Sequence, residues 1–453
     1  MEKIFKLFPL NNNCKIAILG LGYVGLPLAI EFCKSRKCLI TGKQLNRSVI
    51  GFDINENRIN ELKNNIDYTE QFTQEDLKKL NNIKFTSDEN SLIDADVFII
   101  TVPTPINANN EPDLRFIKKA SRDIGFVIKK RREYPKENQS NPIIIYESTV
   151  YPGATEEIFI PLIESNSGQK LNQDFFCGYS PERINPGDSE NTIDKIKKVT
   201  SGSNDLVASW IDSFYASFID AGTFKVRSIR VAEAAKIIEN TQRDINIALV
   251  NELSILFKKL NINTNEVLDA AATKWNFHKY KPGLVGGHCI GVDPYYLTFK
   301  AREIGFKTEL IASGRKINDY MHKYLLEQII IQSSKRNVKD QKEKVLILGI
   351  SYKENCPDIR NSQILLLVEN MLKRNMDITI VDPIVNSQKV YEKINLKSYE
   401  LIPESEKYTI IIFALNHLKF DYITNQKIEE LSNDETIIFD LTNNLSAENI
   451  FHL

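Results

Sequence analysis

The residues best suited to chemistry lie where the chain reads GGHCIGVDPYY. Cys289 follows two glycines and His288, and Asp293 lies four residues after it. Because glycines let the backbone approach a ligand closely, we expect a loop that presents this thiol to a substrate. A single cysteine is usually inert packing, but these neighbours favour a nucleophile.

A second set of polar residues is spaced for one face of a helix. Lys236 and Asn240 are four residues apart, and Glu233 and Arg243 extend the same stripe. Taken alone, the stripe favours a solvated helix face. An ammonium beside a carboxamide nevertheless supplies the donors that stabilise an alkoxide or a tetrahedral oxyanion.

The N-terminal segment carries a dinucleotide-binding pattern. ILGLGYVG places Gly20, Gly22 and Gly25 in GxGxxG spacing, directly after an apolar run and before a helical pattern. Such glycines permit a tight turn and a close approach to pyrophosphate at a helix N-terminus. Asp53 ends the next apolar run and favours NAD over NADP, because a carboxylate repels a 2′-phosphate. Arg58 is expected either to reach the cofactor or to lie on a solvated helix face.

NAD, a thiol and oxyanion donors together fit the oxidation of a primary alcohol to a carboxylate. A first hydride transfer gives an aldehyde, and addition of the Cys289 thiolate gives a thiohemiacetal that can lose a second hydride. Water then hydrolyses the thioester, so two NAD are used for each substrate. Glu182, in GYSPERINPGD, could activate this water, although an ordinary surface residue is an equally good interpretation.

Alternating strands and helices must position these residues. Apolar, β-branched runs such as KIAILGL, SVIGFDI and DVFIITVPT are separated by helical patterns, which predicts a doubly wound parallel α/β sheet. Thr104, Ser148 and Thr149 follow two such runs, at strand ends where ligands bind. For Thr104, in TVPTP, a plain strand-to-turn segment is the alternative interpretation. The expected domains are an NAD-binding Rossmann domain, a central helical domain and a second, smaller Rossmann-like domain, at 1–212, 213–325 and 326–453.

The central part of the chain predicts one long helix. Residues 231–260 contain neither Gly nor Pro, and such a length suits a spine between domains or a subunit interface. A further helical stretch over 311–336 and the charged segment KRNVKDQKEK follow it. Alternation then restarts with VLILGI, which predicts a second, smaller parallel sheet.

Composition excludes several classes of partner. The 453 residues include 58 Lys and Arg against 59 Asp and Glu, so no basic field attracts nucleic acid or an anionic membrane. The six cysteines lack a CxxC pair, which argues against a disulfide framework and a zinc site. We expect reduced thiols, a cytoplasmic location, no metal, no membrane insertion and a small-molecule partner.

Eight motifs occur in the order of a known family: GLGYVG, GFDIN, VPTP, ESTVYPG, SPERINPGD, KIIENTQRDINIALVNEL, GGHCIGVDPYYL and YKENCPDIRNS. From about Cys14 onward the chain resembles the UDP-glucose/GDP-mannose dehydrogenase family. The resemblance implies that the central helical domain serves dimerisation and catalysis and that the last domain, 326–453, binds the UDP-sugar. Two of these motifs, SPERINPGD and GGHCIGVDPYYL, resemble the branch that oxidises UDP-N-acetylhexosamines, including the UDP-N-acetylglucosamine 6-dehydrogenases of capsule and O-antigen synthesis. UDP-glucose or UDP-N-acetylmannosamine 6-dehydrogenation is the alternative, and a homodimer or higher homo-oligomer is expected.

The resemblance implies a role for individual positions. Cys289 is the implied nucleophile, Lys236 and Asn240 are the donors, and Glu182 is the carboxylate for hydrolysis. The implied holders of the catalytic water are Asp293 and Thr149. The expected cofactor contacts are Gly20, Gly22, Tyr23, Val24, Gly25, Asp53, Arg58, Thr104, Ser148, Thr149 and Arg360. The expected substrate contacts are Glu182, Arg183, Ile184, Asn185, Lys236, Asn240, Arg243, Lys281, Gly286, His288 and Lys353.

Three positions depart from the family's pattern. Pro186 stands where UDP-glucose enzymes carry a second glutamate, so hydrolysis depends on Glu182 alone or on another water arrangement. Lys281 stands where relatives often have arginine. Lysine keeps the positive charge but cannot donate the two parallel hydrogen bonds that arginine makes to a phosphate or carboxylate. The lengthened segment 33–48 is expected to alter the cofactor-side surface.

Two other functions remain open from the residues. A two-electron hydroxyacid dehydrogenase also uses a helix lysine with an asparagine four residues on, but it needs neither Cys289 nor a third domain. A non-catalytic NAD and nucleotide-sugar sensor would not need the intact set of Lys236, Asn240 and Cys289.

Overall fold

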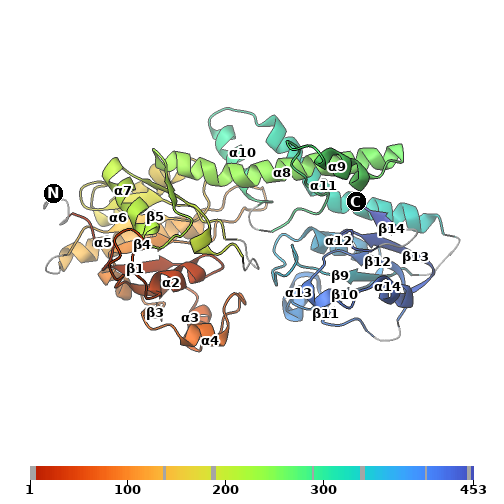
Figure 1. Cartoon of the computed structure of the whole chain (residues 1–453), viewed down its shortest axis with the longest axis horizontal. Helices are drawn as coiled ribbons and strands as arrows, with labels where there is room; N and C mark the ends of the chain where they lie inside the picture. Colours follow the sequence, from red (N-terminus) through yellow and green to blue (C-terminus); the bar gives the residue numbers. More distant parts are fainter. Residues whose placement is uncertain are drawn as a thin grey trace. The chain divides into compact units, whose positions relative to one another are not determined.

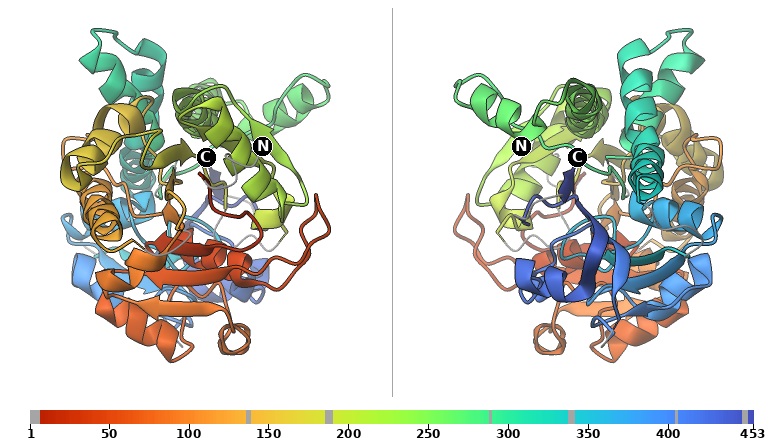
Figure 2. Two further views of the ribbon diagram at one scale, coloured as in Figure 1. Left: turned by 90° about the vertical axis from the view of Figure 1, so that its left-hand side faces the viewer. Right: turned by 90° about the vertical axis from the view of Figure 1, so that its right-hand side faces the viewer.

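The computed structural model describes residues 7–135, 139–184, 190–287, 290–336, 342–403, 406–445 and 450–453. These residues form two compact units (Figures 1 and 2). The first unit comprises Met1–Glu239 with Tyr295–Glu303, and the second comprises Asn240–Pro294 with Ile304–Leu453. The three-domain division expected from the sequence stays a prediction.

The first unit is built on an eight-stranded sheet in the order β3-β2-β1-β4-β5-β6-β7-β8. Neighbouring strands are parallel except β6 and β7, which are antiparallel. The reversal of strand order between β1 and β4 is the switch point at which dinucleotides bind in such folds. The strands are β1 Lys15–Leu19, β2 Ser48–Phe52, β3 Ile83–Thr86, β4 Val97–Ile100, β5 Ile143–Tyr146, β6 Phe176–Tyr179, β7 Lys198–Gly202 and β8 Thr223–Lys225.

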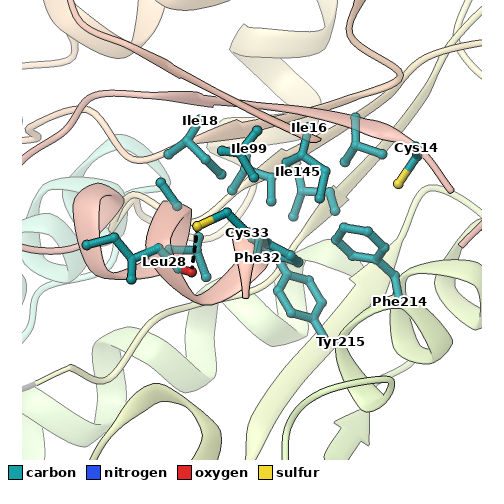
Figure 3. Close-up of a cluster of buried hydrophobic side chains, with 14 of the residues drawn as sticks. Cys14, Ile16, Ile18, Leu28, Phe32, Cys33, Ile99, Ile145, Phe214 and Tyr215 are labelled. Atoms are coloured by element: carbon teal, nitrogen blue, oxygen red, sulfur yellow. Dashed lines mark hydrogen bonds between the residues drawn. The ribbon is translucent and has the colours of Figure 1, made fainter. Parts of the chain in front are cut away.

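Helices cover both faces of this sheet, as the apolar runs predict. On one face, Ile16 and Ile99 belong to a buried cluster with Phe32 and Phe214 (Figure 3). On the other, Tyr146 shares a hydrogen bond of 2.8 Å with Ser121 of α5. The helical elements are α2 Gly25–Cys33, α3 Glu56–Lys63, α4 Gln74–Lys78, η1 Glu89–Asp94, α5 Arg115–Glu133, η2 Thr155–Phe159, α6 Ile160–Ser167, η3 Ile193–Lys195 and α7 Asp205–Ala216.

The lengthened segment 33–48 braces the end of α7. Arg47 is buried, donates a hydrogen bond of 2.9 Å to the Ser217 hydroxyl, and lies 4.4 Å from the Phe214 ring centroid. It also donates to the carbonyl of Asn11, just before β1, at 2.9 Å. The segment joins α2 to the start of β2, so it lies at the amino end of β2 and not at the carboxyl ends of the strands, where the cofactor is expected. The expected effect on the cofactor-side surface was therefore wrong.

The predicted long helix is confirmed as α8, Ile229–Leu260. The other central helices are α9 Thr264–Ala272, α10 Asp293–Glu303 and α11 Glu309–Ser334. Within the second unit, α8 packs on α11 through a buried ion pair of 2.5 Å between Asp244 and Arg315. Asn318 of α11 donates a further hydrogen bond of 2.7 Å to the Asp244 carboxylate.

The second unit carries the predicted smaller parallel sheet, in the order β11-β10-β9-β12-β13-β14. Val345 and Ile347 of β9 join one core cluster with α11 and α12, and Leu346 and Leu348 join another with α14. Both faces of this sheet are therefore covered. Its elements are β9 Lys344–Leu348, α12 Gln363–Leu372, β10 Asp377–Val381, α13 Ser387–Ile394, β11 Ser398–Tyr399, β12 Tyr408–Phe413, η4 Leu418–Phe420, α14 Asn425–Leu431, β13 Ser432–Asp440 and β14 Ile450–His452.

Among the described residues, no helix combines the length and apolar character that crossing a membrane requires. The cytoplasmic location stays a prediction of the sequence.

Candidate active site

The glycine turn between β1 and α2 fits a dinucleotide. Gly20 has φ +96°, and a Cβ there would lie 3.0 Å from the Thr101 carbonyl oxygen. A Cβ on Gly25 would lie 1.8 Å from the Gly20 carbonyl oxygen, so only glycine allows the helix to start so close to the turn. A Cβ on Gly22 would meet no atom within 4 Å. Gly20 and Gly25 therefore pack tightly against the protein, whereas the space beside Gly22 is open, and a pyrophosphate would lie there.

Asp53 lies at the end of β2, beside this turn. Its carboxylate accepts hydrogen bonds from the backbone N–H of Leu21 at 2.8 Å and of Asn55 at 2.9 Å. These bonds fix the carboxylate next to the turn, as binding of ribose hydroxyls requires. The glycines and this carboxylate are the residues that would hold NAD.

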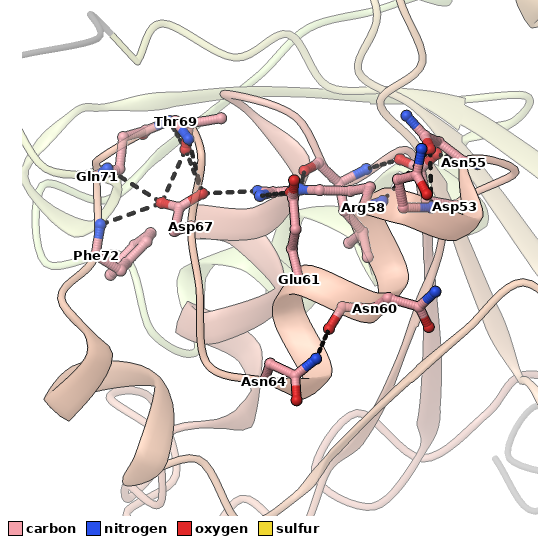
Figure 4. Close-up of polar contacts among 12 residues, drawn as sticks. Asp53, Asn55, Arg58, Asn60, Glu61, Asn64, Asp67, Thr69, Gln71 and Phe72 are labelled. Carbon is pink, nitrogen blue, oxygen red and sulfur yellow. Dashed lines mark hydrogen bonds and ion pairs between the residues drawn. The ribbon is translucent and has the colours of Figure 1, made fainter.

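The Arg58 guanidinium is buried and braces the same turn (Figure 4). Its Nε donates to the Leu21 carbonyl at 2.9 Å, and its Nη2 donates to the Asp67 carboxylate at 2.8 Å. The guanidinium also lies 4.2 Å from the Tyr68 ring centroid. The solvated-face interpretation of Arg58 was therefore wrong, and direct contact with the cofactor stays a prediction.

Replacing Gly25 with alanine is expected to weaken NAD binding at least about tenfold, or about 1.4 kcal/mol. The new Cβ cannot lie 1.8 Å from a carbonyl oxygen, so the turn must move away from the pyrophosphate position. Isothermal titration calorimetry with NAD measures the change. Gly283→Ala is the matched control, because a Cβ there meets no atom within 4 Å. Unchanged affinity in a folded Gly25→Ala protein would contradict the assignment.

The residues after β4 and β5 shape the same edge of the sheet. The Ser148 hydroxyl donates to the Val102 carbonyl at 2.7 Å, which ties the two strand ends together. Tyr296, fully buried in the first unit, donates to the Thr104 carbonyl at 2.8 Å. Thr149 follows Ser148 and is half-buried. These contacts fix the backbone of the expected nicotinamide pocket.

Glu182 follows β6 and belongs to a buried charge cluster. Its Oε2 accepts from the Lys198 ammonium at 2.5 Å, and its Oε1 accepts from the Arg183 backbone N–H at 2.7 Å. The same ammonium donates to Glu147 at 2.7 Å, and Glu147 accepts a hydrogen bond from the Tyr215 hydroxyl. The surface-residue interpretation of Glu182 was therefore wrong, since this side chain is 5% exposed.

The polar stripe of α8 is buried rather than solvated. Glu233 and Asn240 are fully buried, and Lys236 is 5% exposed. The Glu233 carboxylate accepts hydrogen bonds from the backbone N–H of Gly153 at 2.6 Å and of Thr155 at 3.0 Å. Burial raises the pKa of Glu233 to about 7, although these hydrogen bonds oppose the rise.

Glu233 gives the stability of the protein a specific pH dependence. A carboxyl whose pKa is higher in the folded than in the unfolded state stabilises the fold at low pH, and this contribution is lost as pH rises from about 4.5 to about 7. The loss is up to about 3 kcal/mol. Urea unfolding at about pH 4.5 and about pH 7 should show that the free energy of unfolding of the native chain falls between these pH values, and that it falls less in Glu233→Gln. Glu75→Gln removes an exposed carboxylate and serves as the control. Equal declines in all three proteins would contradict this prediction.

In the second unit, two predicted site residues 53 positions apart in the sequence are in contact. The Asn240 carboxamide donates to the Asp293 carboxylate at 2.6 Å, and both side chains are buried. Asp293 is the first residue of α10. The bond fixes the orientation of the carboxamide and accounts for an aspartate four residues after Cys289.

The glycines before Cys289 pack tightly on the segment that links β9 to α12. A Cβ on Gly286 would lie 2.6 Å from the Asn361 carbonyl oxygen, and one on Gly287 would lie 2.5 Å from the Tyr352 ring. This packing places the loop beside the segment that contains Lys353 and Arg360. Lys353 is half-buried, and Arg360 pairs with Asp358 at 2.7 Å.

The remaining predicted residues have diverse settings. Lys281 is exposed and Arg243 is half-buried. Arg183 pairs with Glu239 at 2.5 Å, and Ile184 packs against the core of the first unit. Tyr23 and Val24 are half-buried in the glycine turn. Asn185, Pro186, His288 and Cys289 lie outside the described residues.

Sequence models of three domains of one family match the chain in succession. The NAD-binding domain of the UDP-glucose/GDP-mannose dehydrogenase family matches residues 14–219. The central domain of that family matches residues 230–320, and its UDP-binding domain matches residues 346–447.

Curated relatives match over nearly their full length. The UDP-N-acetyl-D-glucosamine 6-dehydrogenase of Salmonella typhi is 48% identical over 441 residues, which covers 96% of this chain and 98% of the relative. An enzyme of the same name from Pseudomonas aeruginosa is 47% identical, covering 95% and 97%. Protein CapL of Staphylococcus aureus is 46% identical, covering 97% and 98%.

A solved structure supports the same relationship. The UDP-D-ManNAc dehydrogenase from Pyrococcus horikoshii superposes with a TM-score of 0.81 at 28% identity, covering 97% of this chain and 98% of that one. With the glycine turn and Asp53 in place, and with sequence models of three domains of the family matched, the chain belongs to the UDP-glucose/GDP-mannose dehydrogenase family and is an NAD-dependent UDP-sugar 6-dehydrogenase.

Proposed function

We propose that the protein oxidises the C6 alcohol of UDP-N-acetyl-D-glucosamine to a carboxylate, at the expense of two NAD per sugar. The observation that carries this proposal is 48% identity, over 96% of the chain, to an enzyme named for that substrate. The product would supply an N-acetylhexosaminuronic acid for capsule or O-antigen synthesis. The name of the CapL relative supports such a role.

The first half of the reaction converts the alcohol into an aldehyde. NAD, when bound, accepts the hydride that leaves C6. The buried Lys236 ammonium and Asn240 carboxamide would stabilise the alkoxide that forms as the C6 hydroxyl loses its proton. Because Asn240 donates one N–H to Asp293, its carboxamide is held in one orientation before substrate binds.

The second half uses Cys289 and Glu182. The thiolate adds to the aldehyde carbon, and the carbonyl oxygen becomes an alkoxide that the same donors would stabilise. After loss of the second hydride, the carbon and sulfur form a thioester. Water adds to this carbon, Glu182 accepts the proton of the water, the C–S bond breaks and the thiolate is regenerated. Asp293 and Thr149 are the proposed holders of this water.

A homodimer is also part of the proposal. The central segment exposes large apolar side chains that a second copy would cover. They are Leu249, Leu256 and Leu260 of α8, Trp275 and Phe277 after α9, and Ile304, Phe306 and Leu310 around the start of α11. Light scattering coupled to gel filtration should give twice the mass of the 51.9 kDa chain.

The substrate assignment is tested with a panel of UDP-sugars. We expect kcat/KM for UDP-N-acetylglucosamine to exceed that for UDP-glucose by at least about tenfold, because buried polar groups that bind an acetamido group lose partners when it is absent. UDP-N-acetylgalactosamine and UDP-N-acetylmannosamine complete the panel. A preference for UDP-N-acetylmannosamine would favour the activity named for more distant relatives, at 30% identity. A preference for UDP-glucose would contradict the proposal.

A further inference from the structure

A lysine without an assigned role forms a buried ion pair with Glu182. Lys198, the first residue of β7, is 3% exposed in its side chain, and its ammonium bridges Glu182 at 2.5 Å and Glu147 at 2.7 Å. The Glu147 side chain is fully buried, and its other oxygen accepts a hydrogen bond from the Tyr215 hydroxyl. The ammonium also lies 5.1 Å from the centroid of the Tyr215 ring. Glu147 and Tyr215 thus fix Lys198 against Glu182.

The charges of this cluster depend on one another. Burial raises the pKa of Glu147, and Lys198 opposes that rise. Burial alone would lower the pKa of Lys198, but the two carboxylates outweigh it and raise this pKa overall. Burial also raises the pKa of Tyr215 well above its usual value, which keeps the hydroxyl protonated as a donor. The nearby Arg183 and Glu239 are paired with each other.

The contacts leave Glu182 able to accept a proton from water. An ionised carboxylate has about four acceptor positions. Lys198 occupies one on Oε2, and the Arg183 backbone N–H occupies one on Oε1. These bonds hold the carboxylate in one orientation, and the contacts among the described residues leave acceptor capacity on each oxygen.

We propose that Lys198 is a positioning residue for thioester hydrolysis: its ammonium holds the Glu182 carboxylate in one orientation and offsets the charge of the neighbouring Glu147. This inference rests on the proposed function, in which Glu182 accepts the proton of the hydrolytic water. Without the ammonium, two buried carboxylates would face each other and one would retain a proton. A protonated Glu182 cannot act as the base.

The test compares full-length Lys198→Met with the native chain, using NAD and UDP-N-acetylglucosamine in rapid mixing. The initial burst of NADH should remain, because both hydride transfers precede hydrolysis. The rate after the burst should fall at least about tenfold, and intact-protein mass spectrometry should detect the sugar nucleotide held on the enzyme. In Lys198→Met, the rate after the burst should begin to rise at a higher pH than in the native chain. Lys198→Arg should restore much of the rate, and the exposed neighbour Lys197→Met should behave as the native chain.

A double variant separates this role from a purely structural one. Glu147→Gln/Lys198→Met keeps the net charge of the cluster, so its pH profile should return towards the native one while the rate after the burst stays low. It also replaces Lys198→Met if the single variant fails to fold. A native rate after the burst together with a native pH profile, in either folded variant, would overturn the proposal. It would also be overturned if the burst and the rate after it slowed by the same factor with no shift in the pH profile.

Glu182→Gln distinguishes failure of this inference from failure of the proposed function. If Glu182→Gln hydrolyses the thioester at the native rate, the assignment of Glu182 as base is wrong. The role of Lys198 is then wrong too, because it depends on that assignment. If Glu182→Gln is slow and Lys198→Met is not, only the role of Lys198 is wrong. If hydrolysis is slow in both variants and the pH profile shifts only in Lys198→Met, the roles of Glu182 and of Lys198 are both supported.

Discussion

Replacing Cys289 with serine is expected to abolish release of the carboxylate product while NAD binding is retained. A serine hydroxyl is far less ionised than a thiol at neutral pH, so it adds poorly to an aldehyde. Formation of the acid should fall by about 10³-fold or more. Mass spectrometry of the UDP-sugar products measures the loss, and calorimetry checks that NAD still binds.

The matched control for this variant is Cys38→Ser. Cys38 is a buried, unpaired thiol in the segment 33–48, which leads to the amino end of β2. This variant should form the acid at the native rate. Native acid formation by Cys289→Ser would show that the thiol is not the nucleophile.

Replacing Lys236 with methionine is expected to slow the first hydride transfer by about 10²–10³-fold, the usual loss for one oxyanion donor. Lys236 is 5% exposed on α8, and methionine fills a similar volume without the ammonium. The NADH burst in rapid mixing should therefore become slow. This distinguishes Lys236→Met from Lys198→Met and Glu182→Gln, in which the burst should remain fast.

Lys259→Met is the control on the same helix, because Lys259 is exposed in the last turn of α8. It should keep both the burst and the steady rate. A fast burst in Lys236→Met would remove this lysine from the alkoxide-stabilising role. An equal slowing in both variants would point to a general effect on α8 instead.

The parts of the site that depend on local pattern could be predicted from the sequence. The glycine turn, Asp53 and α8 each follow from short-range signals: glycine spacing after an apolar run, an acidic residue at a strand end, and an uninterrupted helical composition. The observed strand order around β1 and β4 also agrees with the predicted doubly wound sheet.

The parts that depend on tertiary partners could not be predicted. A stripe of Glu233, Lys236 and Asn240 has the same pattern whether α8 is solvated or covered, and only the fold shows that it is covered. Arg58 similarly looks like a surface residue until Asp67 and the Leu21 carbonyl are placed around it.

Lys198 and Glu147 were missed for a related reason. Each is a charged residue at the end of a short strand, and a charged residue is usually exposed. Their contact arises because β7 runs antiparallel to β6 and starts beyond its carboxyl end, beside Glu182. A charged side chain at the end of each of two buried strands was the available signal, and it became interpretable only once those strand ends were placed together.

The most direct test of the account is the ratio of NADH formed to UDP-N-acetylglucosamine consumed by the native chain. The account predicts two NADH per sugar and a product carrying a carboxylate at C6. One NADH per sugar, with an aldehyde as the product, would contradict the four-electron reaction and the roles assigned to Cys289, Glu182 and Lys198.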